Sequence, residues 1–273
     1  MEAMNADRTR PVTDGRLLDD DAHLAARHTL HDLQQPTYDL PALIAGSLAD
    51  EHRTVLDLAC GSGADLHRLR SELPEATTIG VGASPGVLED LPPPVLCAAA
   101  AQLPIRTAGV DAVLALHALH RLPDIDAALA EVVRVLEPSG LLVASTNAED
   151  DKQELDDLWQ AAAADVLGTD QGSRPARLSD RFPLDAGAAQ LREYFGDVTV
   201  QQLTGSIAAH DPAPVLDHLG SYRVWAAQTG VPYDEIVRRA RERLNTAIAS
   251  DGAFTITTRQ GVIRAADPED GDA

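Results

Sequence analysis

The chain has 273 residues, of which 44% are hydrophobic and 24% charged, and its 22 basic and 43 acidic residues give a formal net charge of −21 at pH 7. This length suits one large or two small domains with a sizeable core, and the composition is ordinary for a soluble globular protein. Because the strong negative charge repels phosphate backbones and anionic membrane surfaces, we expect neither a nucleic-acid partner nor a membrane partner.

Signals for export, membrane insertion and metal binding are missing from the sequence. No apolar run reaches the roughly 18–20 residues that cross a bilayer, and the first ten residues lack a cationic-then-apolar signal pattern. Cys60 and Cys97 are too few for a disulfide framework or a four-ligand zinc site. We therefore expect a cytoplasmic protein without disulfides or a metal.

The first half of the chain alternates between two kinds of segment. After a polar stretch to residue 20, the apolar spacing of residues 21–49 is roughly helical. Five short apolar runs then predict strands at residues 54–58, 77–81, 95–98, 110–116 and 141–146, with helices between them at residues 64–73, 85–91 and 125–136. Such alternation predicts an open α/β sheet, mostly parallel, with helices on both faces.

The last third has a different pattern. Helices are predicted at residues 149–167 and 185–195, and strands at residues 198–203 and 254–263. About fifty residues connect these two strands, with helical patterns at residues 215–219 and 233–249. A connection of this length in a compact fold usually has its own structure and often covers a site.

A glycine-containing loop is the most informative motif. The apolar strand from Val55 leads into Gly61 and Gly63, and a predicted helix follows directly. Glycines let a ligand approach the backbone closely, and a helix N-terminus offers free N–H groups with a positive dipole end. Asp57, at the end of the strand, can orient the loop or face a cationic group. These residues predict a site for a nucleotide-like or carboxylate-bearing ligand at the carboxyl edge of the sheet, with a plain strand–turn–helix as the alternative.

The segment LDLACGSG at residues 56–63 resembles the first motif of class I S-adenosylmethionine-dependent methyltransferases, of the small-molecule type. The segment IGVGASPGVL at residues 79–88 is similar to the second-strand segment of that family. AAAQLP at residues 99–104, VDAV at 110–113, LHRLPD at 119–124 and ALAEVVRVLEPSG at 128–140 then match its later blocks in order. The likeness covers roughly residues 50–147.

The resemblance implies a Rossmann-like, doubly wound, mostly parallel sheet of seven strands with one antiparallel strand near an edge. It implies S-adenosylmethionine as cofactor and S-adenosylhomocysteine as product. It divides the chain into a helical lid segment (1–50), the cofactor-binding core (51–205), a helical substrate-cap insertion (206–250), and the final strand with an acidic tail (251–273). The implied cofactor-contacting residues are Arg27, Asp57, Ala59, Gly61, Gly63, Gly82, Ala83, Ser84, Ala100, Gln102, Leu103 and His117.

Four positions depart from the family pattern, and the changes at Ala59 and Ser139 are structurally mild. Gly82 stands where the family has an acid that binds both ribose hydroxyls, and Ala99 stands where it has an Asp near the adenine amino group. A hydrogen bond to a charged group contributes about 1.5–3 kcal/mol, so the two losses weaken binding by a factor on the order of 100 or more. Three accounts stay open: an active methyltransferase with altered cofactor contacts, a family member that no longer transfers methyl, or a different ligand.

Candidate catalytic and substrate residues follow from their places in the chain. His120, His117 and His28 are candidate bases, because an imidazole can titrate near pH 7; local packing is the alternative for the first two. Arg27 can pair with the methionine carboxylate. For the N-terminal candidates, the alternative that we favour is that they are solvated helix residues: Arg27, His28, His31 and Tyr38. Candidate substrate contacts are His31, Tyr38, Tyr222 and Trp225, with the cap's own small core as the alternative that we favour for Trp225.

The interpretation that unites these features is a methyltransferase acting on a small-molecule, secondary-metabolite-like acceptor by in-line transfer. The rival keeps the fold and acts as a cyclase, a rearrangement catalyst or a binding scaffold. A ribosomal RNA methyltransferase is a third, weaker alternative. The sequence leaves the oligomeric state and the acceptor atom open.

Overall fold

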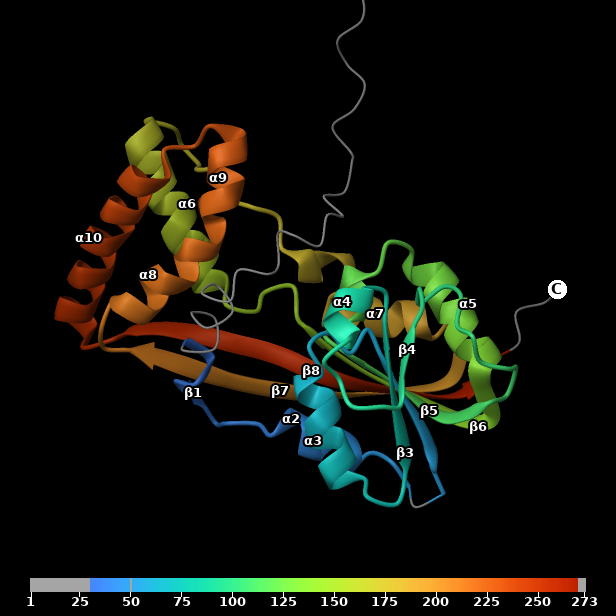
Figure 1. The fold of residues 1–273 in the computed structure, drawn as a ribbon. Coiled ribbons are helices and arrows are strands. Elements are labelled where there is room, and N and C mark those ends of the chain that lie inside the picture. The colour runs from blue at the N-terminus through green and yellow to red at the C-terminus, as the bar shows by residue number, and fades with distance from the viewer. Residues whose placement is uncertain (1–29, 50, 270–273) are drawn as a thin grey trace, which may run out of the picture.

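A computed structural model describes residues 30–49 and 51–269 of the chain. One mixed sheet has the strand order β1-β7-β8-β6-β5-β2-β3-β4 (Figure 1). Its strands are β1 (Gln34–Gln35), β2 (Thr54–Leu58), β3 (Thr77–Gly82), β4 (Val95–Cys97), β5 (Val110–Leu116), β6 (Leu136–Asn147), β7 (Phe195–Ala209) and β8 (Phe254–Pro268). The α-helices are α2 (Leu40–Ala45), α3 (Ala64–Glu72), α4 (Pro85–Leu88), α5 (Ile125–Val135), α6 (Gln153–Leu167), α7 (Leu184–Leu191), α8 (Ala213–Leu219), α9 (Arg223–Thr229) and α10 (Tyr233–Asp251).

The predicted fold class is confirmed. Strands β2 to β6 pair in parallel, and β8 runs antiparallel between β6 and β7. The sheet has eight strands rather than seven, because Gln34 and Gln35 add a two-residue antiparallel strand to the free edge of β7. This strand falls in the segment that was expected to be helical.

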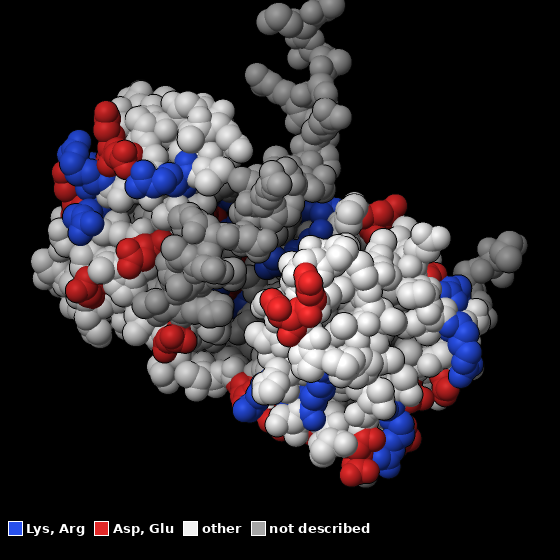
Figure 2. All heavy atoms as spheres, in the orientation of Figure 1, with Lys and Arg blue, Asp and Glu red and all other residues white. Residues whose placement is uncertain are grey.

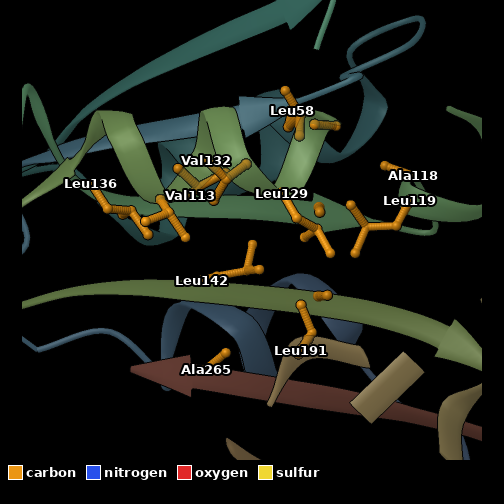
Figure 3. Packing of buried hydrophobic residues seen from close by; sticks show 14 of the residues in the cluster. Leu58, Val113, Ala118, Leu119, Leu129, Val132, Leu136, Leu142, Leu191 and Ala265 are labelled. Carbon is orange, nitrogen blue, oxygen red and sulfur yellow. The ribbon is translucent and has the colours of Figure 1, made fainter. Parts of the chain in front are cut away.

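The central strands read as apolar runs because both of their faces are buried. Val55 of β2 packs on one face of the sheet with Leu69 of α3, whereas Leu56 packs on the other. Figure 3 shows this second face, where Leu129 and Val132 of α5 meet Val113 of β5. Helix α5 begins where the Asp124 carboxylate accepts a hydrogen bond from the Ala127 N–H, a standard N-cap.

Strands β7 and β8 are longer than their apolar patterns predicted. They pair in register from Phe195 with Pro268 to Ala209 with Phe254, and in Figure 1 they run as a long ribbon beyond the other strands. Much of β7 is exposed, and the polar residues that extend it beyond the predicted range do not form an apolar pattern. Main-chain pairing nevertheless continues through them.

A helical layer, formed by α6, α8, α9 and α10, packs on the far end of this ribbon (Figure 1). Its own apolar core surrounds Trp159 of α6 and includes Leu216, Ile236 and Leu244. The layer is therefore larger than the insertion at residues 206–250, because the preceding helix α6 contributes its largest buried side chain.

Candidate functional site

The glycine-containing loop joins β2 to α3 at the carboxyl edge of the sheet. Three of its residues have positive φ: Ala59 (57°), Gly61 (53°) and Gly63 (79°). The Cys60 N–H donates to the Val81 carbonyl at 2.9 Å, which fixes the loop to the end of β3. The loop therefore presents main-chain atoms at the start of α3, with Gly61 exposed.

The two glycines of the loop make a matched pair for mutation. Both glycines have left-handed backbone. The Cβ added by Gly63→Ala would lie 2.5 Å from the Leu91 side chain, whereas the Cβ added by Gly61→Ala would have no atom within 4 Å. Left-handed backbone costs an L-residue about 1–2 kcal/mol. We expect both variants to lose about that much stability in urea unfolding, with the larger loss at Gly63. Equal losses would contradict a packing constraint at Gly63.

Asp57 brings a buried carboxyl to the same loop. It is 2% exposed, and its Oδ2 atom has no hydrogen-bond partner among the described residues. Burial, and secondly the charge of Asp65, raise the pKa of Asp57 to about 7, against the opposing charge of Arg70. An unpartnered buried acceptor favours a ligand that brings its own donor, above all a cationic one.

This raised pKa predicts how stability depends on pH. Between the ordinary pKa of 3.8 and the folded value of about 7, the folded state retains a proton that the unfolded state releases, so Asp57 makes the protein less stable as the pH rises through this range. We expect Asp57→Asn to remove that loss and to be more stable than the wild type above pH 7. Urea unfolding at several pH values measures the effect, with the exposed Asp90→Asn as control. An unchanged pH profile for Asp57→Asn would contradict the expectation.

The neighbouring strand ends complete this side of the edge. Gly82 ends β3, and its carbonyl accepts the Ala98 N–H at 3.0 Å. Ala83 and Ser84 are exposed beside it, and a surface hollow of about 480 Å³ is lined by Pro85, Gly86, Leu88, Glu89, Val95 and Cys97. The predicted cofactor positions on β2 and β3 therefore share one edge of the sheet.

The loop with Ala100, Gln102 and Leu103 is held by a pair of charged residues on α5. Glu131 accepts the Leu103 N–H at 2.7 Å, and Arg134 donates to the Leu103 carbonyl at 3.2 Å while it binds Glu131 at 2.7 Å. Sequence reasoning missed this pair, since a Glu and an Arg three residues apart on a helix usually indicate only a surface ion pair.

His117 and His120 lie together after β5, with ring centroids 6.4 Å apart. Burial is the main cause that lowers the pKa of His117 to about 4, with the charges of Lys152, Arg121 and His31 as further causes. Burial and the charges of Arg121, His117 and Arg181 likewise lower the pKa of His120 to about 3. Both imidazoles are thus neutral and weakly basic at pH 7, which corrects the expectation that they titrate near neutrality.

The structure places only some of the other candidates near these imidazoles. His31 is exposed and close enough for its charge to act on His117. Tyr38 instead holds the chain to β7, because its hydroxyl donates to the Thr204 carbonyl at 2.7 Å. Arg27 and His28 lie outside the described residues.

Tyr222 and Trp225 belong to the core of the helical layer. Both rings pack edge-on against Trp159, at centroid distances of 5.1 and 6.3 Å. The Tyr222 hydroxyl donates to the buried Asp156 carboxylate at 3.2 Å. Their packing fits the alternative of a small cap core, which we favoured for Trp225.

The part of the chain that the structure describes contains neither a candidate membrane-spanning helix nor a candidate metal site. Its helices include none that is long and apolar enough to cross a bilayer. Within the same residues, no three His, Cys, Asp or Glu side chains are grouped so that they could hold a metal ion.

Comparison with known proteins matches the part of the chain that builds this edge. Residues 56–144 match the family described as Methyltransferase domain. Two curated relatives, both named malonyl-[acyl-carrier protein] O-methyltransferase, are 34% identical over 112 residues (Hahella chejuensis) and 32% identical over 146 residues (Laribacter hongkongensis). The chain contains a class I S-adenosylmethionine-dependent methyltransferase domain. The matches cover 38% and 44% of this chain and 40% and 49% of the relatives, so the chain spans less than half the length of either.

Solved structures share the fold of this methyltransferase domain and its flanking elements. A protein of Anabaena variabilis, described as a methyltransferase from an antibiotic biosynthesis pathway, has a TM-score of 0.56 at 17% identity, covering 86% of this chain and 99% of that one. A protein of Anaeromyxobacter dehalogenans, described as a type II methyltransferase, has a TM-score of 0.56 at 22% identity, covering 83% and 94%. Both likenesses concern the fold.

The cofactor of the methyltransferase domain is S-adenosylmethionine, as the resemblance implied. The residues present fit it in two respects. The cofactor's ammonium is the kind of donor that the buried Oδ2 of Asp57 lacks, and the positive-φ loop leaves room for it beside Gly61. Gly82 offers no carboxylate to its ribose.

Proposed function

We propose that the protein transfers a methyl group from S-adenosylmethionine to a small-molecule acceptor bound between the turn after β5 and the helical layer. The observation that carries the proposal is the unpartnered, buried Asp57 carboxyl beside the positive-φ loop of the methyltransferase domain. The curated relatives are named for O-methylation of a malonyl group, so oxygen is the acceptor atom that we favour.

The chain's own residues contribute binding and exclusion of water. When bound, S-adenosylmethionine would supply a sulfonium methyl group to an acceptor that attacks the methyl carbon in line with the carbon–sulfur bond, with S-adenosylhomocysteine as the leaving group; positioning strongly accelerates such a reaction. Asp57 and the loop at Gly61 and Gly63 hold the cofactor's amino-acid part. His117 and His120 form a partly buried wall that stays uncharged at pH 7, so neither is suited to remove a proton from the acceptor.

The rival function keeps the cofactor fold without methyl transfer. A specific observation favours it: Gly82 ends β3 with no acid at the ribose position, and Ala99 is equally without a carboxylate. In this case the cofactor site is weak or empty, and this edge of the sheet binds another ligand.

Thermal unfolding with added ligands separates the two functions. We expect S-adenosylmethionine and S-adenosylhomocysteine to raise the Tm progressively as their concentrations exceed the dissociation constant. ATP is the control, because it has the adenosine part without the amino-acid part that Asp57 would hold. Stabilisation by ATP alone, or by none of the three, would contradict the proposed function.

A further inference from the structure

Lys152 is the only lysine of the chain. It directly precedes α6, in the connection that leaves β6 at the edge described above. Its main chain is left-handed, with φ of 55°, and its N–H donates to the Thr257 carbonyl of β8 at 2.9 Å. The backbone of Lys152 is therefore anchored to the sheet.

A buried carboxylate fixes the end of the Lys152 side chain. Asp151 is 6% exposed, and its Oδ2 accepts from the Lys152 Nζ at 2.6 Å. The other oxygen of Asp151 accepts the Arg259 N–H at 2.8 Å, which holds the carboxylate in place. An ammonium has three donors, and the described residues use one of these, so two N–H groups of a partly exposed cation stay available.

Lys152 lies close enough to the imidazoles after β5 for its charge to act on His117. His117 donates its N–H to the Ser145 carbonyl of β6 at 3.1 Å, so the ends of β5 and β6 lie side by side. The charge of Lys152 is the second cause, after burial, of the low pKa of His117. Figure 2 shows Lys and Arg side chains where the core and the helical layer adjoin, in a chain with a net charge of −21.

We propose that the Lys152 ammonium, held by Asp151, binds an anionic oxygen of the methyl acceptor, which is therefore a carboxylic acid or a comparably acidic hydroxyl compound. The inference rests on the proposed function and names its substrate class. A cation beside an acidic oxygen favours the ionised form of that oxygen. The acceptor then arrives already deprotonated, which agrees with a site whose two imidazoles are weak bases.

A single lysine makes the test direct. Biosynthetic labelling with ¹³Cε-lysine gives one side-chain NMR signal, that of Lys152. The probes are malonyl-N-acetylcysteamine and its methyl ester, each added to the protein with S-adenosylhomocysteine. We expect the acid to move the Lys152 signal at saturating concentration and the ester, which lacks the negative oxygen, to leave it in place. No movement with the acid, or equal movement with both probes, would overturn the inference.

Variants separate charge recognition from a structural role. Lys152→Met is expected to weaken binding of the acid by about tenfold or more, and Lys152→Arg to retain most of it, because the charge remains. Arg223→Met removes an exposed cation that pairs with Asp234 on the helical layer and serves as control. Equal affinity for the acid in wild type and Lys152→Met would overturn the inference.

Binding of S-adenosylhomocysteine keeps the two proposals apart. If S-adenosylhomocysteine binds the wild type but the acid does not move the Lys152 signal, the proposed substrate class is wrong and the methyltransferase function stands. If S-adenosylhomocysteine itself fails to bind, the proposed function fails. Thermal unfolding of each Lys152 variant excludes misfolding as the cause of lost binding.

Discussion

Gly82→Asp is expected to tighten binding of S-adenosylhomocysteine by about ten- to a hundredfold, since a hydrogen bond to a carboxylate contributes about 1.5–3 kcal/mol. The residue ends β3 at the same edge as the Ala59–Gly63 loop. Its φ lies outside the left-handed range, so an L-residue is accepted there. A Cβ would lie 3.1 Å from the Leu88 Cδ2, which requires only a small shift of that side-chain end. Calorimetric titration measures the affinity.

Gly82→Ala is the matched control, because it adds the same Cβ without a carboxylate. We expect it to bind no more tightly than the wild type. Unchanged affinity in Gly82→Asp would show that the ribose hydroxyls are already held by another group of the chain. Tighter binding in both variants would assign the gain to a stiffer backbone rather than to the acid.

Trp159→Ala is expected to lower the free energy of unfolding by about 3–5 kcal/mol, the usual cost of removing a large buried aromatic side chain. Trp159 is completely buried and packs against Tyr222, Trp225 and Tyr233. Its indole N–H also donates to the Ser173 carbonyl at 2.9 Å. The variant therefore leaves both a cavity and an unpaired carbonyl in the helical layer, and urea unfolding measures the loss.

Val224→Ala is the control for that measurement. Val224 lies in the same layer, on α9, but is 41% exposed, so its truncation should change stability by no more than about 0.5 kcal/mol. A loss in Trp159→Ala as small as in Val224→Ala would contradict a single packed core that joins α6 to the three later helices.

The strands and helices that sequence predicted best are those in which apolar pattern and burial coincide. The bounds of β2 (Thr54–Leu58) and β5 (Val110–Leu116) equal the predicted ones, because both strands are buried on both faces. The second half of β7 was missed because residues such as Thr204 and Ser206 are exposed. Their pairing with β8 depends on main-chain hydrogen bonds, which a hydrophobic pattern does not predict.

The strand–loop–helix of the candidate cofactor site could be predicted from local motifs, whereas the electrostatics after β5 could not. The glycines beside Asp57 are contiguous in sequence, so the loop was visible as a pattern. Burial is the main cause of the low pKa values of His117 and His120, and charges distant in the chain, Lys152 for His117 and Arg181 for His120, lower them further. Only the folded structure brings these charges close to the imidazoles. For the same reason, the sequence did not indicate a role for the Asp151–Lys152 pair, apart from the rarity of lysine in the chain.

Calorimetric titration of the wild type with S-adenosylhomocysteine, in two buffers of different ionisation enthalpy, tests the central claim most directly. We predict saturable binding at one site, with release of protons at neutral pH, because an ammonium beside Asp57 favours the ionised form of a carboxyl whose pKa is about 7. Absence of binding would contradict the account as a whole. Binding with the same heat in both buffers would contradict the role given to Asp57.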